Sequence, residues 1–123
     1  MFGAKDLLDL LKTRRSIRKY KNKEIEKNLL EQILKAGLLA PSSRSRRPWE
    51  FITVTDKQKL KALSGCREGS SYFLANAAAA VVIVADPAKC DVWVEDCSIA
   101  AIIMQLTAHS MGLGSCWMQV RER

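Results

Sequence analysis

The stretch Pro41-Ser42-Ser43-Arg44-Ser45-Arg46-Arg47-Pro48-Trp49 separates a predicted helix from a predicted strand. Before it, apolar residues recur at helical spacing from about Glu26 onward, with charged residues on the opposite side. Pro41 ends this helix, because the residue before a proline disfavours helical backbone. After it, Trp49 to Thr55 is rich in aromatic and β-branched residues, which favours a strand. A stiff loop in this position could hold a ligand, although its arginines could equally face water.

Helices and strands alternate on both sides of this loop. Lys5 to Thr13 has a leucine stripe and is predicted to be a short helix. The basic segment Arg14 to Lys23 is predicted to be irregular or briefly extended. Asp56 is a plausible N-cap for a short helix over Lys57 to Leu63. Ala80 to Ala85 is apolar on both faces, which predicts a strand buried on both sides.

The C-terminal third is predicted to contain one long helix. Asp91 can cap it, and the helix then runs to about Met111. Its stretch Ile99 to Leu106 is apolar almost all round, which indicates a central core helix. Gly112 suits the end of this helix, and Ser115 to Val120 could form one more strand. The pattern therefore indicates an α+β or α/β class, with helices covering a small sheet.

The chain has the size and composition of one globular domain. It has 123 residues, of which 48% are hydrophobic and 27% charged. The longest apolar run, Leu74 to Ala85, is far shorter than the roughly 20 residues of a membrane-spanning helix. Met1 to Lys12 contains two aspartates among its leucines, so a secretory signal is not expected.

The positive charge is concentrated in the first half of the chain. The formal net charge is +7, and residues 1–67 carry 17 Lys and Arg against 7 Asp and Glu. Residues 68–123 carry 3 against 6. The first half therefore suits an anionic partner, whether a phosphorylated small molecule, nucleic acid or a membrane surface.

The cysteines do not form a metal or disulfide pattern. Cys66, Cys90, Cys97 and Cys116 contain no C-x-x-C pair, and with His109 as the single histidine they offer no standard zinc site. We expect four reduced thiols, as in a cytoplasmic protein. Cys116 is not a convincing nucleophile, because His109 is the only base in view.

Two further segments could carry chemistry. Thr13 to Arg18 places three arginines and Ser16 within six residues, and the planar fork of arginine matches a phosphate. The alternative is a solvated basic stretch. In Gly112 to Gln119, two glycines would let the backbone approach a neighbour or a flat ring. The alternative there is a helix end followed by a strand.

Taken in order, these motifs resemble the FMN-dependent nitroreductase family. The resemblance is carried by three segments: Arg14–Arg18, Leu39–Ser43 and Arg47–Ile52. The later stretches Trp93–Asp96 and Ala108–Ser115 fit the same family, so the resemblance extends from about Leu7 to Val120.

The resemblance implies an α+β flavoprotein fold with a central, mostly antiparallel sheet covered by helices. It also implies an intertwined homodimer with FMN at the subunit interface. The implied reaction is ping-pong: NADH or NADPH reduces the flavin, and a nitroaromatic, quinone or similar acceptor takes the electrons. No side-chain acid or base, metal, membrane or nucleic acid is expected to take part.

The same resemblance assigns the cofactor-binding residues. The FMN phosphate and ribityl chain are assigned to Arg14, Arg15, Ser16 and Arg18. The loop beside the isoalloxazine ring contains Pro41, Ser42 and Ser43. Ser45 lies where many members have asparagine, and Arg47 where many have glutamine. Gln119 completes the expected cofactor-binding set.

The sequence ends at Arg123, where family members continue with a further helix and strand. We therefore expect a single nitroreductase-like domain over residues 1–123 that lacks the family's C-terminal portion. Two other functions stay open. The chain could keep the fold without flavin and act as a structural or regulatory dimer, or it could be a basic module that binds nucleic acid.

Overall fold

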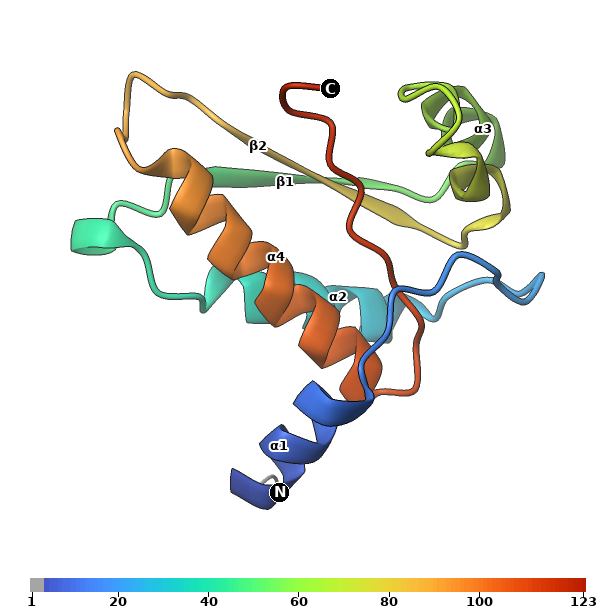
Figure 1. Cartoon of the computed structure of the whole chain (residues 1–123), viewed down its shortest axis with the longest axis horizontal. Helices are drawn as coiled ribbons and strands as arrows, with labels where there is room; N and C mark the ends of the chain where they lie inside the picture. Colours follow the sequence, from blue (N-terminus) through green and yellow to red (C-terminus); the bar gives the residue numbers. More distant parts are fainter. Residues whose placement is uncertain (1–3) are drawn as a thin grey trace.

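The computed structural model describes residues 4–123 as an α+β fold (Figure 1). Its elements in chain order are α1 (Ala4–Thr13), α2 (Lys27–Leu38), the 3-10 turn η1 (Ser43–Ser45), β1 (Trp49–Val54), α3 (Lys57–Leu63), the 3-10 turn η2 (Tyr72–Asn76), β2 (Ala80–Ala85) and α4 (Trp93–Ser110). The predicted helices and the two central strands are confirmed to within a few residues.

The strands β1 and β2 form an antiparallel pair. The register places Trp49 opposite Ala85 and Val54 opposite Ala80. Because successive side chains in a strand point to opposite faces, Trp49 and Phe51 lie on one face and Ile52 on the other. The face with Trp49 and Phe51 is the one that packs against the helices.

The hydrophobic core lies between this sheet face and the crossed helices α2 and α4 (Figure 1). One buried cluster joins Ile33 of α2 to Met104 and Ala108 of α4. A second joins Trp49 to Ala100 of α4 and to Ala40. The expectation that α4 is a core helix is confirmed, since Ala100, Met104 and Ala108 are all buried.

The expectation that β2 is buried on both sides is wrong for the described residues. Every residue of β2 except Val84 is half-buried, and Val84 is 38% exposed. Ile52 of β1, on the same outer face, is 51% exposed. The helices α2 and α4 cover the opposite face, so the apolar outer positions of the pair stay in contact with solvent.

The long helix ends as expected but begins differently. Gly112 has a φ of +79°, a conformation that glycine adopts without a steric penalty. The N–H of Leu113 donates to the carbonyl of Ala108 and that of Gly112 to the carbonyl of His109, which together close the helix in a Schellman motif. At the other end Val92 is the N-cap and no side chain caps the helix. The predicted Asp91 cap is therefore wrong.

The predicted strand over Ser115 to Val120 is also wrong. Ser115 makes an isolated parallel bridge with Ser16, and the N–H of Ile17 donates to its carbonyl at 2.9 Å. Beyond this bridge the tail is irregular. The carbonyl of Gln119 accepts from the Arg67 side chain at 3.2 Å rather than from a neighbouring strand. A strand forms only where a second backbone continues beside it.

None of the helices in the part of the chain that the structure describes has the length and hydropathy needed to cross a membrane. The four cysteines are free thiols. Burial raises the pKa of the Cys97 thiol, and the neighbouring Asp96 and Cys90 raise it further. Cys97 therefore stays protonated near neutral pH, which makes it a weak nucleophile.

Candidate flavin site

The basic segment after α1 is fixed at two points. The hydroxyl of Thr13 lies 2.7 Å from Nε2 of His109, in the last turn of α4. Further along, Ile17 bonds to Ser115, and Gly114 lies so close that a Cβ there would be 3.1 Å from the Ile17 side chain. The segment is therefore held beside the end of α4 and the start of the C-terminal tail.

This arrangement forms a half-open cavity of about 360 Å³ between parts of the chain that are far apart in sequence. Its walls come from the basic segment, the loop before η2, η2 itself and the tail. The lining residues are Arg18, Arg67, Gly69, Ser70, Phe73, Cys116, Trp117 and Met118. Two guanidinium groups and a hydroxyl suit an anion, while the aromatic and thioether side chains suit a planar ring.

Tyr20 lies against this cavity and stays neutral. Its hydroxyl donates to the carbonyl of Ile17, and its ring centre is 6.3 Å from that of Phe73. Burial raises the pKa of Tyr20 to about 12, the nearby Cys116 adds to the rise, and Arg18 opposes it. At neutral pH the phenol is therefore protonated and keeps its bond to the backbone.

The predicted arginines take up different positions. Arg14 is half-buried, whereas Arg15 and Arg18 are exposed. Arg18 lines the cavity. The guanidinium of Arg15 donates to the carbonyls of Lys12 and Arg14, at the end of α1, where a cation also interacts well with the helix dipole. In this structure Arg15 thus stabilises the helix end, and Arg18 is the predicted arginine that reaches the cavity.

Gln119 lies in the tail, and its side chain is bound within the tail. Its Oε1 accepts from the indole N–H of Trp117 at 3.1 Å, and its Nε2 donates to the carbonyl of Arg121. The residue is connected to the cavity through its own carbonyl, which accepts from Arg67.

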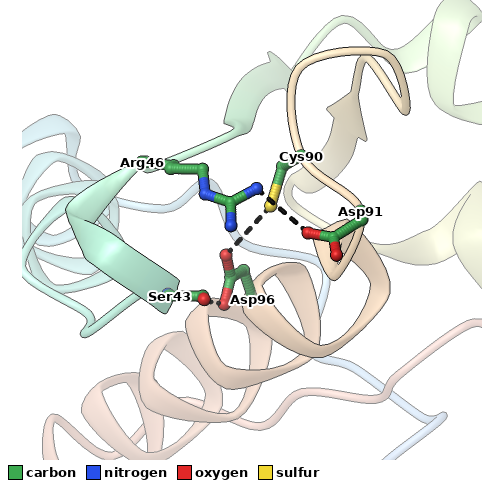
Figure 2. Close-up of polar contacts among 5 residues, drawn as sticks. All are labelled: Ser43, Arg46, Cys90, Asp91 and Asp96. Carbon is green, nitrogen blue, oxygen red and sulfur yellow. Dashed lines mark hydrogen bonds and ion pairs between the residues drawn. The ribbon is translucent and has the colours of Figure 1, made fainter.

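The Pro41–Pro48 loop forms a second polar cluster, shown in Figure 2. The N–H of Ser43 donates to Oδ1 of Asp96 at 3.1 Å, and the thiol of Cys90 donates to Oδ2 at 3.5 Å. Arg46 pairs with Asp91 at 3.0 Å. Arg46 remains exposed to solvent, and its partner Asp91 is more exposed still.

The backbone of this loop is unusual. Arg44, Ser45 and Arg47 have φ values of 54°, 55° and 47°, in the left-handed region that residues other than glycine adopt uncommonly. The hydroxyl of Ser42 accepts from the N–H of Arg47 at 3.0 Å and so bridges the strained part of the loop. Such backbone persists where surrounding contacts hold it, and it gathers at functional sites.

The two groups of predicted site residues lie at opposite ends of α4 (Figure 1). The loop is bound to Asp96 in the early part of the helix, and the basic segment to His109 near its end. At a rise of about 1.5 Å per residue, these two positions are about 20 Å apart along the axis. The structure therefore does not bring Pro41, Ser42, Ser43 and Ser45 together with Arg14, Ser16 and Arg18 within one chain.

Sequence reasoning missed four of the cavity residues: Arg67, Gly69, Ser70 and Phe73. They fall in the loop between the predicted helix over Lys57 to Leu63 and the predicted strand over Ala80 to Ala85. The one feature of the sequence that could have indicated a site there is the positive charge of Arg67. Its contact with the carbonyl of Gln119 is visible only in the structure. Among residues 4–123, no group of three or more metal-ligating side chains comes together.

This fold and cavity define an α+β protein with a basic, partly aromatic ligand pocket. The sequence profile of the nitroreductase family matches residues 11–89 and 65–123. The chain therefore belongs to the nitroreductase family.

Two relatives show how far the similarity extends. A protein of Archaeoglobus fulgidus, named "Putative NADH dehydrogenase/NAD(P)H nitroreductase", is 42% identical over 96% of this chain and 70% of its own length. A solved FMN-dependent nitroreductase from Clostridium difficile is 62% identical, with a TM-score of 0.92, over 94% of this chain and 68% of its own length. The chain spans 61% of another archaeal relative, from Methanothermobacter thermautotrophicus.

A solved nitroreductase from Bacteroides fragilis contains bound FMN. It is 30% identical to this chain, with a TM-score of 0.79, and the match covers 91% of this chain and 68% of that one. The expected family and α+β fold are thus both confirmed.

Proposed function

We propose that this chain is an FMN-dependent NAD(P)H oxidoreductase that reduces nitroaromatics, quinones or similar acceptors. The observation that carries the proposal is the cavity that joins Arg18 and Arg67 to the tail residues Trp117 and Met118. Membership of the nitroreductase family, and the bound FMN named for a related structure, support it.

The donor groups around the cavity fit the two ends of FMN. The phosphate end needs cations and hydroxyl donors: Arg18 lines the cavity, and Arg14 and Ser16 belong to the same short segment but do not line it. The ring end needs flat apolar surface, which Phe73 and Trp117 supply from the cavity wall. Arg67, missed in the sequence, adds a second guanidinium inside the cavity.

Bound FMN would supply the redox chemistry, taking two electrons from NADH or NADPH and passing them to the acceptor. The side chains of this protein bind and orient. Tyr20, neutral because its pKa is raised, anchors the backbone at Ile17 and so places Arg18. We assign no side chain as general acid or base. The physiological acceptor is set by surfaces that the fold alone does not specify.

The loop over Pro41 to Pro48 would reach the ring from a second copy of the chain. None of its residues is among those that line the cavity with Arg18, and it lies at the far end of α4. A homodimer with FMN at its interface meets this requirement. The helix α1 supports the dimer, since Leu7, Leu8 and Leu11 are 49%, 54% and 52% exposed.

Anaerobic titration tests the activity. The purified chain is loaded with FMN, freed of unbound cofactor and mixed with NADH or NADPH, and the flavin absorbance is followed. We expect bleaching by at least one of the two donors and recovery of the colour when a nitroaromatic or quinone is added. Bound flavin that neither donor bleaches would contradict the proposed oxidoreductase activity.

A further inference from the structure

The Pro41–Pro48 loop is attached to the body of the protein through one buried carboxylate. Asp96 is 3% exposed and accepts from the Ser43 N–H and the Cys90 thiol (Figure 2). A buried carboxylate is costly unless hydrogen bonds satisfy it, so both donors matter to its presence there. The Ser43 N–H of the loop therefore supplies one of the hydrogen bonds that stabilise the buried carboxylate of Asp96.

The loop also needs an external restraint, because its own backbone is strained. Arg44, Ser45 and Arg47 all have positive φ, a conformation that is unfavourable for residues other than glycine. Immediately before them, Ser43 is bound to Asp96. Releasing Ser43 would let the next residues relax toward ordinary φ values.

The ion pair between Arg46 and Asp91 is the weaker restraint. The Arg46 side chain is 31% exposed and that of Asp91 80% exposed, and exposed pairs contribute little to stability. The contact of Ser43 with Asp96 is partly buried and carries a charge-assisted bond. Asp96 is thus the dominant tether.

We propose that Asp96 is a positioning residue, which holds the Pro41–Pro48 loop in its ligand-binding shape through the Ser43 N–H. This inference rests on the proposed function, which assigns the loop to the flavin ring. It predicts that the shape of an exposed loop, and its contribution to flavin affinity, depend on a carboxylate that does not itself touch the ligand.

Two matched pairs of variants isolate this contact. Ser43→Pro removes the N–H donor, and the extended backbone of Ser42 (φ −141°, ψ 159°) suits the residue before a proline. Ser43→Ala keeps the N–H and removes only the hydroxyl. Asp96→Ala removes the acceptor, whereas Asp96→Asn keeps an amide oxygen for Ser43. The Ser43 pair changes no buried residue, so it tests the contact even if Asp96→Ala does not fold.

Limited trypsin digestion of the full chain measures whether the loop opens. The loop offers trypsin Arg44 and Arg46, and cleavage after Lys61 in α3 provides an internal reference. We expect Ser43→Pro and Asp96→Ala to raise the rate of cleavage in the loop by about ten- to a hundredfold. Ser43→Ala should stay close to the unsubstituted chain, and Asp96→Asn, which keeps an oxygen for Ser43 but loses the charge, should fall between it and Asp96→Ala. Cleavage after Lys61 should not change.

Flavin affinity distinguishes a positioning role from a purely structural one. If Asp96 only stabilised the fold, opening the loop would leave the affinity for flavin unchanged. Because the loop is assigned to the ring, which FMN and riboflavin share, Ser43→Pro should weaken both flavins by the same factor relative to Ser43→Ala. Loop cleavage at the unsubstituted rate in Ser43→Pro would overturn the proposal, whether or not Asp96→Ala folds. So would an opened loop that leaves flavin affinity unchanged. If the unsubstituted chain binds neither flavin, the proposed function is wrong, and the trypsin rates alone decide whether Asp96 holds the loop.

Discussion

The Thr13 hydroxyl and Nε2 of His109 lie 2.7 Å apart and join the end of α1 to the last turn of α4. The same hydroxyl donates to the carbonyl of Asp9 at 2.7 Å. Since a hydroxyl has a single hydrogen, Nε2 of His109 must carry a proton and donate to Thr13. His109 is therefore a structural anchor that holds the basic segment against the end of α4.

The phosphate assignment predicts a difference between two ligands. If Arg14 and Arg18 hold the FMN phosphate, each charge-assisted contact contributes about 1.5–3 kcal/mol. Arg14→Ala and Arg18→Ala should then each weaken FMN binding by about ten- to a hundredfold. Riboflavin, which lacks the phosphate, should be affected far less. Fluorescence titration with both flavins measures the two affinities.

Lys61→Ala, on exposed α3, is the control for loss of positive charge. It should leave both affinities unchanged. Arg46→Ala does not serve this purpose, because it breaks the pair with Asp91. A folded Arg14→Ala that binds FMN and riboflavin with equally reduced affinity would show that the phosphate lies elsewhere.

The raised pKa of Tyr20 predicts that the free energy of unfolding falls at alkaline pH. Its pKa is raised from the ordinary 10.0 to about 12, mainly by burial, so the folded state holds the phenol proton more tightly than the unfolded state. The stabilising contribution is complete below pH 10 and is lost as the pH rises through about 12. Urea unfolding across this range should show stability falling more steeply for the unsubstituted chain than for Tyr20→Phe. Equal slopes for the two proteins would argue against a buried phenol.

Gly37 lies where α2 crosses α4, and we expect a larger side chain at this position to disturb the packing of the two helices. A Cβ at this position would lie 2.8 Å from Sδ of Met104 and 3.0 Å from the Phe51 ring. Gly37→Ala should therefore lower the free energy of unfolding by about 1–3 kcal/mol, despite the better helix propensity of alanine. Gly65→Ala is the matched control, since its nearest neighbour would be a backbone oxygen at 3.7 Å. A Gly37→Ala protein as stable as the control would contradict the close crossing.

The exposed leucines of α1 predict self-association. We expect a homodimer that buries about 2,000 Å² or more, as obligate interfaces do. Multi-angle light scattering at micromolar concentration should give twice the mass of one chain. Leu8→Glu combined with Leu11→Glu should reduce that mass to one chain, because both side chains are about half exposed in a single copy. A stable, well-behaved unsubstituted monomer would rule out the dimer.

The sequence predicted those elements whose signals are local. Asp56 caps α3 as expected, with its carboxylate accepting from the N–H of Lys59. Gly112 ends α4, and the apolar periodicity located α2. Each of these depends on neighbours within a few residues, so the pattern of residue types was sufficient.

Features that depend on contacts distant in sequence were not predicted. Asp96 lies early in the predicted long helix, and no local pattern indicates that it is buried and bonded to Ser43, 53 residues away. Arg67 lies in a loop without any motif and reaches the tail at Gln119. The tail was expected to be a strand because its residues have strand-like composition, but strand formation requires a partner backbone that composition does not reveal.

The visible absorbance spectrum of the freshly purified protein shows whether the chain binds FMN. We expect a yellow protein with the spectrum of bound oxidised FMN, close to one flavin for each chain, as two equivalent sites in a homodimer require. A colourless protein that stays colourless after incubation with FMN and removal of excess cofactor would contradict it, and would favour a structural or regulatory role. Excess absorbance confined to the ultraviolet would instead indicate bound nucleic acid and contradict the flavin assignment.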